Sequence, residues 1–185
     1  MFAKIGIAVG VCVCLFVVVI AATAGSVASL LAGGTAPPTC MPPASEPGIA
    51  GNYGPEQLSN AAAIVAVGKQ RNVPEQGWVV ALVVAIQESR LHNLDHGDRD
   101  SLGLFQQRPS QGWGSPQQIR NPTYSATQFY QHLLAIPNWQ QMSLNNAAQA
   151  VQHSGVPDAY GRHEHAARQV LGAVHGTACR SEPPA

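Results

Sequence analysis

The feature that most constrains the fold is an unbroken apolar run from Trp78 to Ile86. Because this run has no polar face, a helix made from it must be buried on all sides. Asn72 and Glu75 have the spacing of a capping box, and Pro74 between them is tolerated in a first helical turn. The sequence therefore predicts a central helix, capped by Asn72, against which the other elements pack.

Helical patterns lie on both sides of this run, and nowhere do β-branched residues alternate with polar ones between turn residues, as in a half-buried strand. Prolines, which lack an amide donor, separate the later helices. The expected helices span about 55–70, 123–135, 143–153 and 158–176, with a polar loop over 92–101. We therefore predict an all-α domain over residues 55–178.

An uncharged apolar run over residues 5–22 precedes this domain and continues weakly to residue 32. Its length suits a membrane anchor, whereas the small residues at 22–24 offer a signal-peptide cleavage site. Residues 1–32 are therefore predicted to be one or the other. The stretch 33–54, rich in Pro, Gly and Ala, is predicted to be a linker, and residues 179–185 a tail.

The distribution of basic residues predicts that the domain is exported. Lys4 precedes the apolar run and no further Lys or Arg occurs before Lys69, as the positive-inside rule expects for an extracytoplasmic carboxyl-terminal side. Cys40 and Cys179 are the only cysteines of the exported part. A cysteine pair in an oxidising compartment predicts a disulfide, with two free thiols as the alternative.

The charge composition argues against a nucleic-acid partner. Ten basic and ten acidic residues give a net charge of zero, and no basic cluster is present. Nucleic-acid binding requires clustered Lys and Arg that neutralise phosphates. We therefore expect no nucleic-acid partner, and we expect the domain to be a monomer.

Glu88 lies at the end of the predicted central helix. Burial penalises a carboxylate, and the negative end of the helix dipole penalises it again, so both effects predict a raised pKa. A carboxyl group that stays protonated near neutral pH can donate a proton to a leaving glycosidic oxygen. The alternative is an ordinary glutamate at the solvated end of a helix.

Glu88-Ser89 is followed, after a polar loop, by the sequence Gly-Leu-Phe-Gln at residues 103–106. This ordered pair of motifs resembles the lytic transglycosylases and goose-type lysozymes, with Phe105 in place of the usual Met. The resemblance covers roughly residues 55–174. It implies a lysozyme-like fold of the transglycosylase type, and cleavage of the β-1,4 bond between MurNAc and GlcNAc in peptidoglycan with formation of 1,6-anhydroMurNAc.

The resemblance also implies roles for individual residues. Glu88 is the single catalytic acid and base, Ser89 orients it or binds substrate, and Gln106 hydrogen-bonds a sugar. The family's Ala-Tyr-Asn-x-Gly is replaced by Val-Gln-His-Ser-Gly at 151–155, where Gln152 or His153 takes the place of the Asn. Four further side chains are expected to bind substrate: Phe105, Trp113, Tyr160 and His153. For Phe105, Trp113 and Tyr160 the alternative is packing in the core.

A second carboxylate separates the enzymatic alternatives, because ordinary glycosidases use two and lytic transglycosylases need one. Asp95, Asp98 and Asp100 are the candidates, with a solvated loop as the alternative. The histidines near them fit no familiar metal-binding spacing, so we expect neither a metal nor a cofactor. A goose-type muramidase and a non-catalytic cell-wall binding or assembly protein remain the rival interpretations.

Overall fold

A computed structural model describes residues 39–41, 53–154, 156–175 and 178–180. Within these ranges the chain is predominantly helical, which confirms the predicted all-α class. The longer helices are α1 (Pro55–Gln70), α2 (Glu75–Ser89), α4 (Pro122–Ala135), α5 (Leu144–Gln152) and α6 (Glu164–Val174). The shorter ones are α3 (Pro116–Ile119) and the 3-10 turns η1 (Pro109–Gln111), η2 (Trp139–Gln141) and η3 (Gly161–His163).

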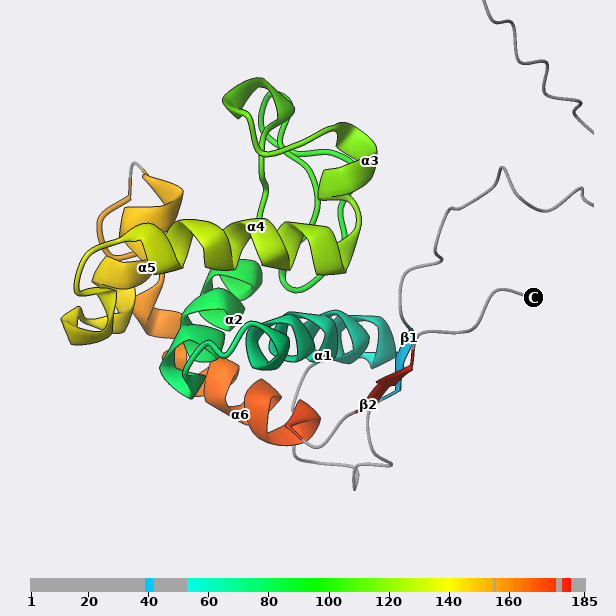
Figure 1. The fold of residues 1–185 in the computed structure, drawn as a ribbon. Helices are drawn as coiled ribbons and strands as arrows, with labels where there is room; N and C mark the ends of the chain where they lie inside the picture. The colour runs from blue at the N-terminus through cyan, green and yellow to red at the C-terminus, as the bar shows by residue number, and fades with distance from the viewer. Residues whose placement is uncertain (1–38, 42–52, 155, 176–177, 181–185) are drawn as a thin grey trace, which may run out of the picture. The chain divides into compact units, whose positions relative to one another are not determined.

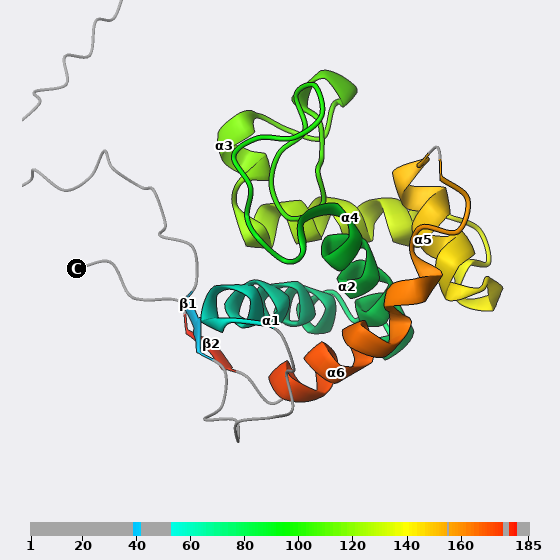
Figure 2. The ribbon, with the colours of Figure 1, turned by 180° about the vertical axis from the view of Figure 1, so that it is seen from behind.

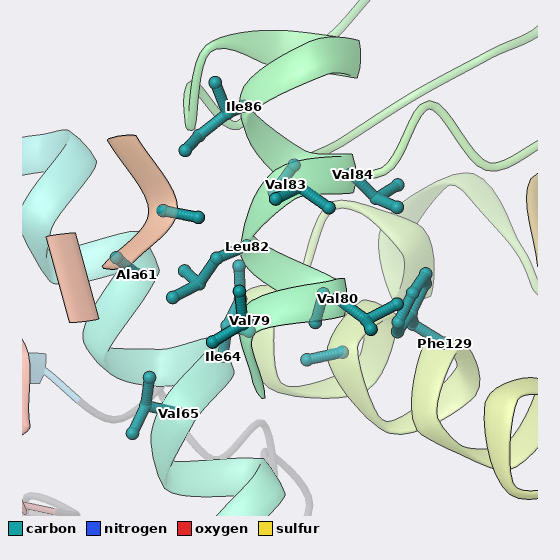
Figure 3. Packing of buried hydrophobic residues seen from close by; sticks show 14 of the residues in the cluster. Ala61, Ile64, Val65, Val79, Val80, Leu82, Val83, Val84, Ile86 and Phe129 are labelled. Atoms are coloured by element: carbon teal, nitrogen blue, oxygen red, sulfur yellow. The ribbon is translucent and has the colours of Figure 1, made fainter. Parts of the chain in front are cut away.

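The predicted central helix is α2. It packs against α1, α4, α5 and α6, and Figures 1 and 2 show these four helices around it. From Val79 to Ala85 every side chain is fully buried. In Figure 3 Leu82 lies towards Ile64 of α1, and Val80 towards Phe129 of α4. Burial of one such side chain stabilises a fold by roughly 1.5–3 kcal/mol. The helix is therefore held firmly, and so are Glu88 and Ser89 at its carboxyl-terminal end.

The capping box predicted at Asn72 is wrong. Helix α2 begins at Glu75, and its N-cap residue Pro74 makes no side-chain capping bond. Asn72 instead has a left-handed backbone with φ of 53°, and it ends α1. The Asn72 amide donates to the Lys69 carbonyl and the Val73 amide to that of Gly68, which is a Schellman motif. Asn tolerates the left-handed region better than most residues do, so it serves the preceding helix.

Two short elements modify the predicted pattern. The last helix was expected from residue 158, whereas α6 begins at Glu164 after the 3-10 turn η3. Helix α3 was not predicted, although Ser115 caps it and Pro116 occupies its first turn. No helix in the part of the chain that the structure describes is long and apolar enough to cross a membrane. The apolar run over residues 5–22 lies outside that part.

A pair of short strands was also not predicted. β1 (Thr39–Met41) and β2 (Ala178–Arg180) are antiparallel, with Cys40 opposite Cys179. From the sequence, residues 39–41 are expected in the linker and residues 178–180 at the boundary between the domain and the tail. Opposed positions on paired strands bring Cα atoms within the range that a disulfide requires. The cysteine side chains lie outside the described residues, so the disulfide stays a prediction.

Candidate active site

A cavity of about 360 Å³ lies beside the carboxyl-terminal end of α2. This volume falls within the range of sites that bind small molecules or parts of polymers. It is lined by five of the residues predicted from the sequence, which come from four separate segments of the chain: Glu88, Gln106, Trp113, His153 and Tyr160. The structure therefore brings together side chains that lie up to 72 residues apart in sequence.

Glu88 is positioned by the buried helix and by two polar neighbours. The Tyr160 hydroxyl donates a hydrogen bond of 2.9 Å to Glu88 Oε1, and the Gln152 side chain also bonds the carboxylate. Burial raises the pKa of Glu88 above its ordinary value, while the hydrogen bonds from Tyr160 and Gln152 lower it in part. A carboxyl group in this environment can both release and recover a proton.

Tyr160 is a fixed hydrogen-bond donor. Its side chain is fully buried, and burial together with the neighbouring Glu88 carboxylate raises the pKa of its hydroxyl group well above the ordinary value. Its backbone is also held, because Asn145 Oδ1 accepts from the amides of Tyr160 and Gly161 at 3.2 Å each. The hydroxyl therefore stays protonated and directed at Glu88 through the neutral pH range.

Ser89 lies next to Glu88 but does not line the cavity. It is buried, and its Oγ lies 2.9 Å from the Ala85 carbonyl oxygen and 2.8 Å from that of Leu104. Only one hydroxyl hydrogen is present, so one of these bonds forms at a time. The contact joins the end of α2 to the 103–106 segment, and Ser89 is placed to orient that segment rather than to touch a ligand.

Residues 103–106 form a tight turn against α3 and α4. Gly103 has a φ of +73°, and a Cβ atom there would lie 2.7 Å from the Ile119 carbonyl oxygen, so the position requires glycine. Phe105 is fully buried and stacks on Phe129, with 4.8 Å between ring centroids. Its ring belongs to the core and is not exposed to the cavity. Gln106 does line the cavity, and its backbone is left-handed with φ of 47°.

The aromatic and polar wall opposite Glu88 contains Trp113 and His153. Trp113 is half-buried, and its ring stacks on His132 with 4.0 Å between centroids. Such a supported indole can present an apolar face to a sugar ring. His153 is exposed and forms the left-handed cap of α5.

Gln152, and not its neighbour His153, which was predicted to bind substrate, contacts Glu88. Its Nε2 donates to the Phe105 carbonyl oxygen at 3.0 Å, and the same side chain bonds Glu88. The amide group thus links α5, the 103–106 turn and the candidate acid. The altered family motif at residues 151–155 indicated that one of these side chains belongs to the site, but it did not decide between Gln152 and His153.

The three loop aspartates do not line the cavity. Asp100 accepts from Arg108 Nε at 2.6 Å and from the Ser110 amide at 2.8 Å, and these bonds hold the pKa of Asp100 well below its usual range. Asp95 is exposed, and a hydrogen bond from His96 lowers its pKa. Asp98 is exposed and lies 3.9 Å from Arg99.

Among the residues that the structure describes, Glu88 is the only one with a carboxylic side chain that lines this cavity. Within the described ranges, no group of three or more His, Cys, Asp or Glu residues is arranged to hold a metal ion. No family model and no curated protein matches the chain. The geometry by itself defines a polar cleft, lined also by Arg108, with one partly buried carboxyl group, which is suited to general acid and base chemistry on a polar ligand.

Proposed function

We propose that this protein is a peptidoglycan lytic transglycosylase, in which Glu88 serves as the acid and then as the base. The observation that carries the proposal is the isolation of Glu88. It is the single carboxyl group lining the cavity, it stands at the end of a buried helix, and burial raises its pKa. A reaction that needs two carboxylates finds no second one among the described residues that line this site.

In the first step, protonated Glu88 donates its proton to the glycosidic oxygen. The bond between the anomeric carbon of the muramic sugar and that oxygen breaks, and the departing sugar leaves as an alcohol. Positive charge develops on the anomeric carbon while Glu88 becomes a carboxylate. The Tyr160 hydroxyl, 2.9 Å from Glu88 Oε1, then stabilises the new negative charge.

In the second step, the Glu88 carboxylate takes the proton from the 6-hydroxyl of the same muramic sugar. The 6-oxygen attacks the anomeric carbon and closes a 1,6-anhydro ring, so no water is consumed. Glu88 returns to its protonated form without an external proton donor. The raised pKa of Glu88 suits both steps, because a catalytic group is most effective when its pKa lies near the working pH.

The remaining cavity residues have binding roles in this proposal. Gln106 lines the cavity while its Nε2 donates to the His96 and Gly103 carbonyl oxygens at 3.3 Å each, so its role is to shape the wall against which the sugar lies. The Trp113 ring packs against a sugar face. Gln152 fixes the Glu88 carboxyl against the 103–106 turn. The substrate lies outside the cytoplasm, and we propose that the apolar run over residues 5–22 directs export or anchors the chain at the membrane.

The test is digestion of purified peptidoglycan by the full chain, with the product masses read by mass spectrometry. Transglycosylation gives 1,6-anhydro ends, about 18 mass units lighter than hydrolysed ends because no water is added, as expected when one carboxylate suffices. Glu88→Gln is the inactive reference. Glu164→Gln, which alters a half-buried glutamate that forms an ion pair with Arg168 and does not line the cavity, is the matched control. Reducing ends would assign a muramidase, and intact strands would overturn the enzyme proposal.

A further inference from the structure

A second cavity, of about 610 Å³, lies beside the same carboxyl-terminal turn of α2 and shares no lining residue with the first. Gln87 lines it, whereas the next residue, Glu88, lines the candidate active site. Successive residues on a helix point about 100° apart, so the two cavities flank one helical turn. The 3-10 turn η3 and its N-cap residue also face both cavities, because Tyr160 lines the first cavity and Arg162 lines the second.

The second cavity is lined by two arginines, Arg90 and Arg162, and by no aspartate or glutamate of the described residues. The carboxylate of Glu56 is bonded to the lining residue His92 at 3.2 Å, so two arginines stand against one neighbouring carboxylate. In the described part of the chain neither arginine forms an ion pair with a carboxylate, whereas Arg99, Arg108 and Arg168 each do. Guanidinium groups are preorganised to bind carboxylates through two parallel hydrogen bonds. The charge of this cavity therefore favours an anionic ligand.

The two arginines are anchored in different ways, one through its side chain and one through its backbone. Arg162 Nη2 donates to Gln87 Oε1 at 2.8 Å. The backbone of Arg90 is anchored through its carbonyl oxygen, which accepts from Gln57 Nε2 of α1 at 2.7 Å. The Arg90 side chain is exposed and makes no hydrogen bond to another described residue. The cavity thus has one fixed guanidinium group and one that is free to close on a ligand.

The rest of the cavity includes apolar surface. Ile86 is almost fully buried at its base, and the half-buried ring of Tyr53 lies along another part of the wall. A ligand that matches this lining combines a carboxylate with short alkyl groups. A short peptide with a free carboxylate has that chemistry, whereas a sugar lacks the charge and inorganic phosphate lacks the apolar part.

We propose that this cavity binds a carboxylate of the stem peptide carried by the same glycan strand that lies at Glu88. This inference rests on the proposed function. A helix with its side chains is roughly 10–12 Å across, and an extended peptide spans about 3.3–3.6 Å per residue. A peptide of about three residues or more, attached to the muramic sugar, therefore reaches from one cavity to the other around the end of α2.

Direct binding is the first test. The probe is the free stem tetrapeptide released from peptidoglycan by an amidase, and the readout is NMR shifts of the Ile86 methyl groups and the Arg162 side chain in the full chain. We expect saturable shifts. Replacing Arg90 and Arg162 together by Gln should weaken binding about tenfold, which corresponds to the loss of one charge-assisted contact. Arg90→Lys keeps the charge but loses the planar guanidinium group, so its affinity for the tetrapeptide should lie between those of the unmodified chain and the double variant.

The controls separate the sources of an anion. Arg168→Gln removes an exposed arginine on α6 that does not line the cavity, and it should bind the tetrapeptide as the unmodified chain does. Inorganic phosphate at the same concentration should give much smaller shifts. If phosphate binds as well as the peptide, the site is for a phosphate-bearing polymer and the peptide assignment is wrong. No shift with either probe overturns the proposal.

The second test uses cleavage of strands with and without stem peptides. The ratio of kcat/KM between peptide-bearing and peptide-free strands should fall about tenfold in the double arginine variant and stay constant in Arg168→Gln. An unchanged ratio in the double variant contradicts the proposal. If the unmodified chain cleaves neither strand, the proposed function fails while the binding measurement still decides whether the cavity takes a peptide carboxylate.

Discussion

Glu88 and the loop aspartates are separated by only a few residues, yet their carboxyl groups have opposite surroundings. Glu88 ends a buried helix, and its neighbours are a tyrosine and a glutamine. Asp95 and Asp100 lie in a loop, and their neighbours are a histidine and an arginine. The first environment raises a carboxyl pKa and the second lowers it. Catalytic potential thus follows from what surrounds a carboxyl group, not from how many lie nearby.

Of the variants that test this difference, Glu88→Gln should produce the largest loss of cleavage. The amide keeps the shape and can still accept the Tyr160 hydrogen bond, but it cannot donate a proton to the leaving oxygen. General acid catalysis contributes typically about 10²–10⁴-fold, so cleavage should fall by at least about 10²-fold. Release of soluble glycan fragments measures the rate, and circular dichroism checks that the helices persist. Near-normal cleavage would mean that the site has been assigned wrongly.

Tyr160→Phe should have the next largest effect. The change removes the hydroxyl group that stabilises the Glu88 carboxylate, and hydrogen bonds to charged groups contribute about 1.5–3 kcal/mol. The rate should fall by roughly tenfold to a hundredfold. Because the lost bond lowers the pKa of Glu88, the alkaline limb of the rate profile should move to higher pH. A downward movement of that limb would contradict the assigned donor.

Asp95→Asn and Asp98→Asn should change cleavage very little. Both side chains are exposed and neither lines the cavity, so the effect expected for a surface substitution is within about 0.5 kcal/mol, or roughly twofold in rate. Initial rates on the same peptidoglycan preparation provide the measurement. A loss comparable to that of Glu88→Gln would show that a second carboxylate participates, as in a hydrolase.

The stability of two variants should depend on pH in opposite directions. A raised Glu88 pKa means that the wild-type chain loses stability as the pH rises through that pKa, whereas Glu88→Gln does not ionise. Its Tm relative to wild type should therefore increase from about pH 4 to about pH 8. Asp100 has a lowered pKa, so Asp100→Asn should be less stable than wild type near neutrality, with the difference shrinking in acid. Parallel trends in the two variants would contradict this account.

The sequence predicted the class of the fold because the apolar run Trp78–Ile86, as a helix, must be buried on all sides, and the segments around it carry helical patterns. Of the residues singled out from the sequence, five line one cavity, whereas Ser89, Phe105 and the loop aspartates do not. The helix boundaries were less predictable. Asn72 has two favourable uses, as a cap for the following helix or as the left-handed end of the preceding one, and the local sequence does not decide between them.

The parts of the site that the sequence left open depend on tertiary packing. From the sequence alone, Phe105 is compatible with a sugar-binding role or with a place in the core. Its stacking on Phe129 assigns it to the core, and this contact depends on the tertiary fold. The role of Gln152 follows from the approach of α5 to the 103–106 turn, 47 residues away in sequence. The second cavity was not foreseen, because Arg90 and Arg162 come together only when η3 packs beside the end of α2.

The most direct test of the central claim is a titration of individual carboxyl groups by ¹³C NMR in the full chain. Glu88 and Asp100 should be followed in the same spectra, with assignments from Glu88→Gln and Asp100→Asn. We expect a Glu88 pKa above the ordinary value for glutamate and an Asp100 pKa below the ordinary value for aspartate. A Glu88 pKa at or below the ordinary glutamate value would contradict its role as the acid.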